Sequence, residues 1–252
     1  MSQPVRQFFD SQVAAYSANF LGSPTGASYC FATRLQAARD LAIGSGGRLL
    51  DCACGTGEIT QAVFEAGSFS EAVVADISTA MIEQTRRLLD GSTGASAIQW
   101  RIGDIFEILK EPARLGGTFD VILALGLIAH TGRLEELLRL LAGHLRPGGR
   151  ILLQSTLIDH PGARLLSVTS RHRHRRQKGY DITWYSKHEI ECAAETAGLA
   201  IDSVQRYGFC LPWGDRIWPK ANHWLERRLS GLSRRWGAEV VFELAKPGGI
   251  RE

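Results

Sequence analysis

Residues 46–60 read GGRLLDCACGTGEIT, where a short apolar run ends at Asp51 and a turn with Gly55 and Gly57 follows. The run at 47–53 has the length and the flanking turn residues of a buried strand. After the glycines, Glu58 begins a stretch with helical character. Open α/β sheets bind their ligands where such a strand turns into a helix, so this stretch predicts both the fold class and the position of a site.

Short apolar runs rich in β-forming residues recur along the chain and alternate with helical stretches. Four of them follow the first run, at 71–77, 97–103, 119–127 and 149–157. This alternation predicts right-handed crossovers and a parallel sheet. Two further runs, 199–208 and 237–248, enclose mostly helical material, which predicts an antiparallel final strand.

Capping residues indicate where several helices begin and end. Ser78 and Thr131 are predicted N-caps, and RPGG at 146–149 is predicted to end the helix that Thr131 begins. Ser186 and Glu189 form a predicted capping box for a later helix.

Length and composition indicate one large soluble domain. The chain has 252 residues, 44% of them hydrophobic and 22% charged, and its formal net charge of +3 does not by itself indicate nucleic-acid binding. Neither a run of about 18 apolar residues nor the apolar core of a secretory signal is present. The five cysteines form neither CxxC pairs nor a zinc spacing, which predicts reduced thiols, a cytoplasmic location and no metal site.

Two familiar glycine motifs do not fit the turn. A P-loop requires a lysine where Glu58 stands, which excludes a triphosphate cradle, and a dinucleotide fingerprint requires further glycines. Gly55 and Gly57 instead allow the main chain to approach a ribose and an amino-acid tail. Asp51 would repel a phosphate and attract a cationic amino group. The pattern therefore favours a ligand that joins a nucleoside to an amino acid.

Acidic residues end the next two strands as well. Asp76 follows the second run, where a carboxylate can accept hydrogen bonds from both ribose hydroxyls. Asp104 follows the third run and can accept from an adenine amino group, with the backbone amide of Ile105 beside the ring. Each acid alone is equally compatible with a helix N-cap or a loop position, but three acids at three successive strand ends favour a common ligand.

In this order and spacing, LLDCACGTGEIT, VVADIS, GDI, FDVILAL and HLRPGGRILL resemble the motifs of the class I S-adenosylmethionine-dependent methyltransferases. The resemblance extends over roughly residues 30–208. It implies a Rossmann-like, doubly wound α/β fold with a seven-stranded, mostly parallel sheet and an antiparallel last strand. It also implies S-adenosyl-L-methionine as the cofactor and methyl transfer as the activity.

The expected organisation is a single domain over residues 1–252, with an insert between the last two strands. Its parts are an N-terminal helical cap at 1–45, a cofactor-binding core at 46–157, a basic flap at 158–185 and a C-terminal part at 186–252 with an aromatic-rich insert at 208–237. No repeat, low-complexity tract or linker divides the chain.

The resemblance assigns cofactor roles to residues at the strand ends. Arg34 matches an arginine that grips the cofactor carboxylate, which suits the bidentate pairing of a guanidinium. Leu125, after the fourth run, would line the methyl-transfer channel. The other assignments are Asp51, Ala53, Gly55 and Gly57 for the methionine portion, Asp76 for the ribose, Asp104 and Ile105 for the adenine, and Ile77 and Met81 as further cofactor-binding residues.

The segment LGLIAHTGRLEELLRLLAGHLRPGGRILL is similar to the ubiquinone-pathway and other small-molecule O-methyltransferases. His130 matches a histidine of that group, although Ala129 stands where the quinone branch often has glutamate. His130 is the candidate general base for a hydroxyl acceptor, and its alternative role is to cap the loop before Thr131. His223, beside Trp224, is a second candidate base.

Acceptor recognition is expected from three segments outside the core. Residues 3–20 predict a helix that closes over the cofactor, with Tyr16 reaching the sulfonium or the acceptor. Residues 164–178, in a stretch without acids, predict either a solvated basic loop or a mobile flap for an anionic acceptor, an acidic carrier or the lipid headgroups of a peripheral membrane contact. The predicted substrate-binding residues are Tyr16, Arg171, Arg173, Trp213 and Trp218.

Three functional hypotheses follow. The favoured one is methyl transfer to a small-molecule or lipid-linked acceptor at oxygen, in a biosynthetic pathway. An RNA or protein methyltransferase is the second, but the sequence has neither an NPPY-type motif nor an appended nucleic-acid domain, which disfavours nucleic acid as a partner. A non-catalytic cofactor-binding protein is the third, and the intact set of glycines and strand-end acids argues against it.

Overall fold

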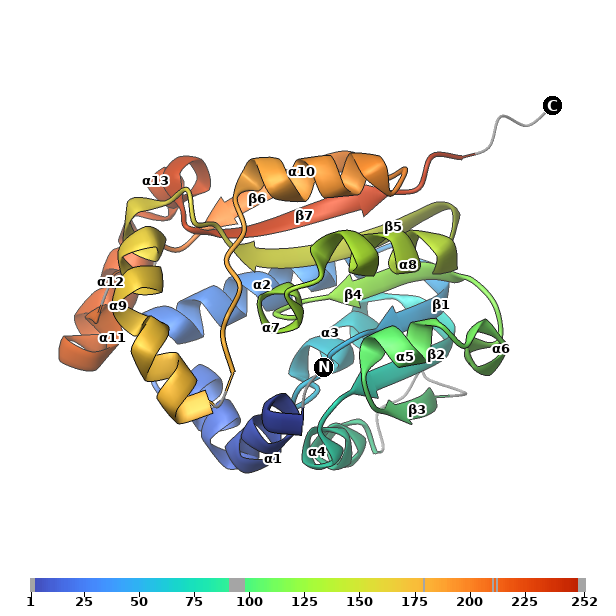
Figure 1. Ribbon diagram of the computed structural model, residues 1–252, viewed down its shortest axis with the longest axis horizontal. Coiled ribbons are helices and arrows are strands. Elements are labelled where there is room, and N and C mark those ends of the chain that lie inside the picture. Colours follow the sequence, from blue (N-terminus) through green and yellow to red (C-terminus); the bar gives the residue numbers. More distant parts are fainter. Residues whose placement is uncertain (1–2, 91–97, 179, 210, 212, 249–252) are drawn as a thin grey trace.

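The computed structural model describes residues 3–90, 98–178, 180–209, 211 and 213–248, without the side chains of 17, 19 and 170–178 (Figure 1). Its strands are β1 (Gly46–Asp51), β2 (Ser68–Asp76), β3 (Ile98–Ile102), β4 (Phe119–Ala124), β5 (Leu145–Thr156), β6 (Ala200–Tyr207) and β7 (Glu239–Ala245). Within the described residues these form one seven-stranded sheet in the order β3-β2-β1-β4-β5-β7-β6. β7 is antiparallel to both β5 and β6 and the other pairs are parallel, which confirms the predicted fold class.

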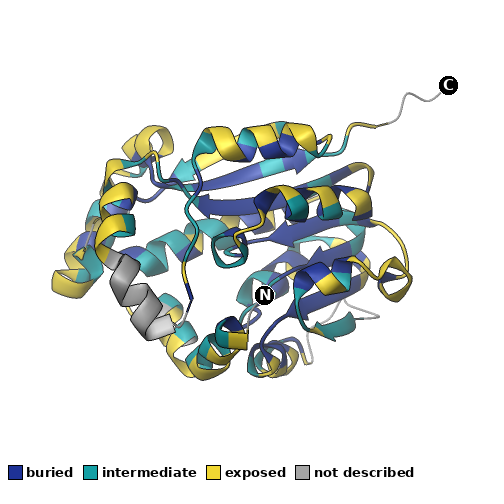
Figure 2. Ribbon diagram, in the orientation of Figure 1, coloured by how far each residue is buried: buried dark blue, intermediate teal, exposed yellow. Residues whose placement is uncertain are grey.

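Helices cover both faces of the sheet (Figure 1). One face carries α5 (Ile105–Leu109), α8 (Leu134–His144) and α10 (Lys187–Thr196), and the other carries α2 (Gly26–Ala42), α3 (Glu58–Ala66) and α4 (Thr79–Leu89). Successive residues of a strand point to opposite faces, so Leu50 packs with the first set of helices and Leu49 with the second. Both leucines are fully buried, and the buried strands lie between helices whose outer faces are exposed (Figure 2).

Two helices begin where the sequence predicts. The Ser78 hydroxyl accepts from the Met81 amide at 3.1 Å, which caps α4. Ser186 and Glu189 form the capping box of α10. Both caps bind amides that have no partner inside the helix, and they therefore fix the first turn.

Two boundaries around α8 differ from the prediction. Thr131 does not begin this helix but ends α7 (Ile128–Thr131), because Gly132 turns the chain at φ 63° before α8 starts. The RPGG stretch at 146–149 lies inside β5, since α8 has already ended. The register between β4 and β5 shifts across this stretch, so these residues form a bulge rather than a helix stop.

The N-terminal segment forms α1 (Gln3–Ser17) and a π-helical turn, η1 (Ala18–Gly22), so the predicted helix over residues 3–20 is confirmed. The Arg6 Nε donates to the Ile77 carbonyl at 3.0 Å. The Ser78 hydroxyl donates to Asp10 at 2.6 Å. These bonds hold α1 against the junction of β2 and α4, where the second strand-end acid lies.

Residues 161–178, predicted to belong to a mobile flap, form helix α9 (Pro161–Lys178). Proline favours the first position of a helix, and the His160 ring accepts from the Gly162 amide at 3.2 Å, so the helix begins there. Arg171 and Arg173 belong to the part of α9 whose side chains are not described, and their predicted substrate contacts lie outside the described residues. Across the described parts of the chain, no helix is both long and apolar enough to cross a membrane.

The insert between β6 and β7 contains α11 (Gly214–Ile217), α12 (Pro219–Arg228) and α13 (Ser230–Trp236). α12 packs against α2, and α13 packs against β6. Asp215 accepts from the amides of Gly26 at 2.5 Å and Ala27 at 2.8 Å. This carboxylate therefore fastens the insert to the N-terminus of α2.

Candidate active site

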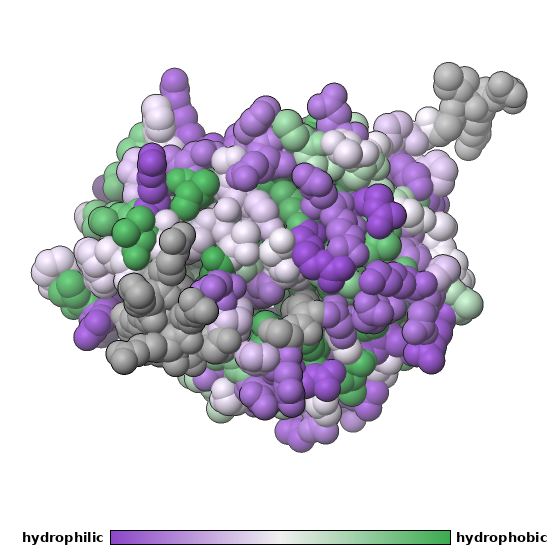
Figure 3. Space-filling model, viewed as in Figure 1, coloured by the Kyte–Doolittle hydropathy of each residue, from purple (hydrophilic) through white to green (hydrophobic). Residues whose placement is uncertain are grey.

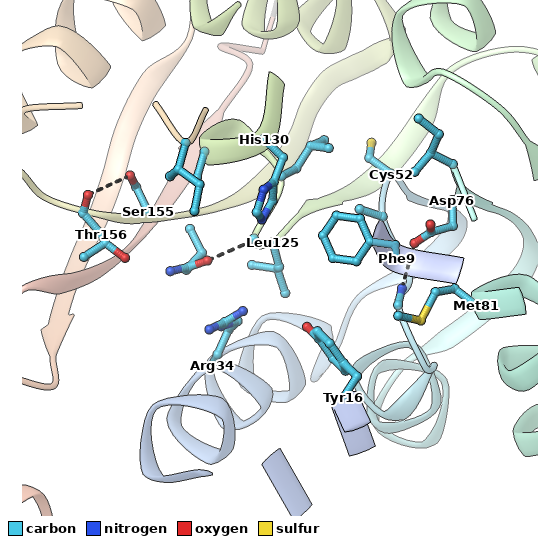
Figure 4. A pocket seen from close by; sticks show the side chains of 18 of the residues that line it. Phe9, Tyr16, Arg34, Cys52, Asp76, Met81, Leu125, His130, Ser155 and Thr156 are labelled. Atoms are coloured by element: carbon cyan, nitrogen blue, oxygen red, sulfur yellow. Dashed lines mark hydrogen bonds between the residues drawn. The ribbon is translucent and has the colours of Figure 1, made fainter. Parts of the chain in front are cut away.

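A cavity of about 460 Å³ lies at the carboxyl ends of β1, β2, β4 and β5, where open α/β sheets bind ligands. Phe9 and Tyr16 of α1 point into it from one side, and Leu125 and His130 point into it from the other (Figure 4). The predicted site residues that line it are Tyr16, Arg34, Ala53, Gly55, Asp76, Ile77, Met81, Leu125 and His130.

The two glycines of the turn serve different purposes. Gly55 takes φ 56° and lines the cavity, where an added Cβ would come 3.8 Å from the Tyr16 ring. Gly57 takes φ 96° at the start of α3, and a Cβ there would lie 2.7 Å from the Cγ2 of Thr85. Gly57 thus allows α3 to approach α4, and the structure places it in helix packing behind the cavity wall.

Two strand-end carboxylates are buried and held by hydrogen bonds. Asp76 lines the cavity and accepts from the amides of Gly55 at 3.0 Å and Ser78 at 2.9 Å. Asp51 accepts from the Thr60 hydroxyl at 2.7 Å and lines a smaller adjoining hollow. Desolvation by burial raises the pKa of each carboxyl to about 6, because it outweighs the hydrogen bonds. Both acids therefore favour a ligand that brings hydroxyl donors or positive charge.

Arg34 lies across the cavity from Asp76 (Figure 4). Its Nε is buried and has no hydrogen-bond partner among the described residues. A buried donor in this state is costly unless a ligand or a water molecule accepts from it. A guanidinium, a carboxylate and the bare backbone of Gly55 fit S-adenosyl-L-methionine, which carries a carboxylate at one end and ribose hydroxyls near the other.

Glu239, the first residue of β7, lines the cavity and was missed by the sequence interpretation. It accepts from Gln154 Nε2 at 2.5 Å and from the Thr156 hydroxyl at 2.6 Å, and Gln154 accepts in turn from the Gly126 amide at 2.9 Å. Burial raises the pKa of Glu239, and the charge of Arg34 opposes this rise. Glu239 reaches the site because β7 pairs with β5, a long-range contact that no local pattern reveals. This end of the cavity is polar and offers hydrogen bonds to an acceptor.

His130 lies on α7 and points into the cavity (Figure 4). Its Nδ1 is 3.0 Å from the Tyr180 hydroxyl, and the Phe9 ring meets the imidazole at a steep angle with centroids 5.2 Å apart. Burial raises the pKa of Tyr180, so this hydroxyl stays protonated at neutral pH. The imidazole is therefore oriented by a hydroxyl and an aromatic ring, in a position to exchange a proton with a bound acceptor.

Three predicted acceptor or catalytic residues lie away from this cavity. The Nδ1 of His223, on α12, is 3.0 Å from the Thr25 carbonyl, which gives this histidine a structural contact at α2. Trp213 and Trp218 are 45% and 69% exposed on the insert and do not line the cavity. Aromatic composition predicted an apolar wall for the acceptor, but Trp213 and Trp218 flank the short helix α11, which has no buried residue, and their side chains face away from the core.

The predicted adenine residues also lie outside the cavity lining. Asp104 caps α5 by accepting from the Phe106 amide at 2.9 Å. Ile105 is 1% exposed and packs in the core beneath α8. These placements match the helix-cap alternative for Asp104, and the assignment of both residues to the adenine stays a prediction.

Comparison with known proteins defines the class. Residues 50–151 match the model of a methyltransferase domain family. The structure of an S-adenosylmethionine-dependent methyltransferase from Thermotoga maritima, described as a possible histamine N-methyltransferase, superposes with a TM-score of 0.61 over 96% of this chain and 99% of that chain, at 18% identity. The fold is that of the class I methyltransferases.

The chain is also similar to two methyltransferases of ubiquinone biosynthesis. A ubiquinone/menaquinone biosynthesis C-methyltransferase of Roseobacter denitrificans is 30% identical over 166 residues, which are 66% of this chain and 59% of the relative. A ubiquinone biosynthesis O-methyltransferase of Xanthomonas axonopodis pv. citri is 27% identical over 176 residues, 68% of this chain and 70% of the relative. The chain spans about half the length of several other curated relatives that it matches. Together with the matched domain model and the fold, these relatives support a class I S-adenosylmethionine-dependent methyltransferase.

Proposed function

We propose that this protein transfers the methyl group of S-adenosyl-L-methionine to a small-molecule acceptor, at a hydroxyl oxygen, in a biosynthetic pathway. The observation that carries the proposal is that Arg34, Asp76 and His130 enter one cavity from different sides. The cavity, of about 460 Å³, has the volume of a small-molecule pocket, so it can bring bound groups into contact. The cytoplasmic location inferred from the reduced cysteines belongs to the same proposal.

The residues of the cavity then have separate tasks. When bound, S-adenosyl-L-methionine supplies an electrophilic methyl group. Arg34 binds its carboxylate, Asp76 accepts from its ribose hydroxyls, and Gly55 allows close approach of the backbone. Phe9 and Tyr16 enter from α1 and exclude water from the reacting atoms.

At the acceptor end, His130 takes the hydroxyl proton. When its Nδ1–H donates to the Tyr180 oxygen, Nε2 is the ring nitrogen that keeps a lone pair and accepts the proton. Glu239, with Gln154 and Thr156, provides the hydrogen bonds that orient the acceptor. Because the leaving group carries positive charge, alignment of the acceptor contributes more to the rate than any single charged group.

The basic helix α9 is proposed to recognise an anionic acceptor, a lipid-linked acceptor or an acidic carrier. The stretch 160–180 contains no acidic residue, and Arg164 at its start is exposed. A helix with charge of one sign attracts anions over a distance of several ångströms. The activity of the two relatives in ubiquinone biosynthesis supports a lipid-linked acceptor.

The acceptor atom is the part of the proposal that needs a direct test, since the relatives include both a carbon and an oxygen methyltransferase. Transfer of a labelled methyl group is measured with a phenol, its aniline analogue and a carbon nucleophile of the same size. The proposal predicts transfer to the phenol, and it predicts that His130→Ala lowers the rate of this transfer by about 10²–10⁴-fold. The exposed control His188→Ala should leave the rate unchanged. Transfer to nitrogen or carbon alone would overturn the oxygen assignment.

The two remaining hypotheses are separated by the same assay. Cofactor binding without transfer to any acceptor, including protein and RNA fractions, would favour a non-catalytic cofactor-binding protein. Transfer to RNA or to protein in preference to the small molecules would favour the macromolecular methyltransferase. Both outcomes leave the cofactor site intact, so they are distinguishable from failure of the cofactor assignment.

A further inference from the structure

The helices α11, α12 and α13, together with the turn before α11, expose large apolar side chains that the cavity does not use. Those that are 45% exposed or more are Trp213, Ile217, Trp218, Trp224, Leu232 and Trp236. In the space-filling view, apolar residues lie among hydrophilic ones at the side of the molecule where these helices lie (Figure 3). Exposed apolar side chains are ordinary when they are scattered singly. Several exposed tryptophans on one insert are instead typical of a surface that binds a partner.

The same helices turn basic side chains outward and acidic side chains inward. Their exposed cations are Arg216, Lys220, Arg227, Arg228, Arg234 and Arg235. The two acids of residues 214–236 are both used internally. Asp215 binds the N-terminus of α2, and Glu226, 1% exposed, accepts from the Phe209 amide at 2.9 Å. The outer face therefore combines tryptophan with uncompensated positive charge.

A groove of about 450 Å³ continues this surface between α2, β6, α12 and α13. Arg206, Arg227 and Arg234 line it, and none of its described lining residues is acidic. Trp224 and Arg227 are three residues apart on α12, so they are neighbours on one side of the helix. The groove thus offers an anion site directly beside an exposed tryptophan.

We infer that α11–α13 form a peripheral membrane-binding surface that docks onto a bilayer containing anionic phospholipid. Tryptophan favours the boundary between headgroups and acyl chains, and arginine attracts anionic headgroups. A second copy of this chain does not suit the surface, because pairing the same patch would bring the exposed cations together. The inference does not depend on methyl transfer, and lipid binding is measured without a substrate.

Co-sedimentation of the full-length chain with vesicles tests this surface. The wild type is expected to pellet with vesicles that contain phosphatidylglycerol and to stay in the supernatant with phosphatidylcholine alone. Arg227→Gln combined with Arg234→Gln should lower the partition into the anionic vesicles by about tenfold or more. Arg87→Gln combined with Arg139→Gln makes the same charge change on exposed positions of α4 and α8, and this control should bind like the wild type.

The apolar contribution is tested in parallel. Trp224→Ala combined with Trp236→Ala should also weaken vesicle binding, whereas Ile102→Ala, which truncates a 46% exposed side chain on β3, should not. Circular dichroism and thermal unfolding show whether each variant is folded. If the tryptophan variant does not fold, the charge variants alone decide the outcome.

Any of five results would overturn the inference. The first is equal binding of the wild type to both vesicle types, and the second is an equal loss in the charge-matched control. The third is that inorganic phosphate inhibits vesicle binding more than chloride does at the same ionic strength, which would indicate that the groove binds a soluble phosphate compound. The fourth is tighter binding of the arginines to a single-stranded oligonucleotide than to vesicles. The fifth is a dimer in solution that the tryptophans hold together.

Discussion

Replacing Asp51 with asparagine should stabilise the ligand-free protein, although it alters a residue of the candidate site. Asp51 is 4% exposed, and its carboxylate accepts from the Thr60 hydroxyl and the Ala53 amide. These bonds do not offset the loss of water, and desolvation raises the pKa from 3.8 to about 6. An ionised carboxylate in this position therefore costs folding free energy at neutral pH.

The size of the effect follows from that pKa. A rise from 3.8 to about 6 corresponds to about 3 kcal/mol against folding at neutral pH. Asparagine keeps one acceptor oxygen but replaces the other with an NH2 group, so one of the two accepted hydrogen bonds is lost and the net gain in the free energy of unfolding should be about 1–2 kcal/mol. For a chain of this size, that gain raises Tm by about 2–8 °C.

The sign of the pH dependence is also determined. Because the pKa of Asp51 is higher in the folded state, protonation of this carboxyl favours folding. The stabilising contribution is fully present below about pH 4 and is lost as the pH rises through about 6. Asp51→Asn should therefore differ most from the wild type above about pH 6. The difference should shrink below about pH 4, where both side chains are neutral.

Thermal and urea unfolding of the ligand-free protein at about pH 7.5 and about pH 4 measure these differences. Thr60→Val is the matched control, because it removes the hydroxyl donor and leaves the charge, and it should destabilise the protein by about 1–3 kcal/mol at the higher pH. A loss of stability in Asp51→Asn at neutral pH, or a gain that does not change with pH, would refute the reasoning.

Three further substitutions test other parts of the molecule. His130→Ala should lower turnover by about 10²–10⁴-fold with unchanged cofactor affinity, and a loss below about tenfold would give His130 a structural role instead. Gly57→Ala should cost about 2 kcal/mol or more of unfolding free energy, because φ is 96° and the new Cβ would lie 2.7 Å from Thr85; an unchanged urea midpoint would contradict this. Changing the four arginines of residues 171–176 to glutamine should raise the acceptor Michaelis constant but not the cofactor Kd, and normal kinetics at low salt would exclude that role.

The parts of the fold that could be predicted are those with local causes. β1 and β2 are apolar runs that end in an acid, and parallel pairing places their ends side by side. Asp76 therefore reaches the Gly55 amide at 3.0 Å, as the shared position at the strand ends implies. The capping box of Ser186 and Glu189 is equally local, and it begins its helix where expected.

The parts that could not be predicted depend on long-range contacts or on orientation. Glu239 enters the cavity only because β7 pairs with β5 and sets it opposite Thr156. The sequence around Trp218 is the same whether this side chain faces an acceptor or water. The direction of the side chain depends on how the insert packs against α2. Gly57 shows the same limit, because the close approach of Thr85 depends on how α3 packs against α4, and the assignment of Gly57 to the cofactor stays a prediction.

Calorimetric titration of S-adenosyl-L-methionine tests most directly whether this cavity is the cofactor site. The wild type should bind one molecule per chain. Asp76→Ala should bind about 30–150-fold more weakly, since the loss of hydrogen bonds to a buried carboxylate costs about 2–3 kcal/mol. Asp90→Ala, an exposed control at the end of α4, should bind like the wild type. Unchanged affinity in a folded Asp76→Ala protein would contradict the assignment of this cavity to the cofactor.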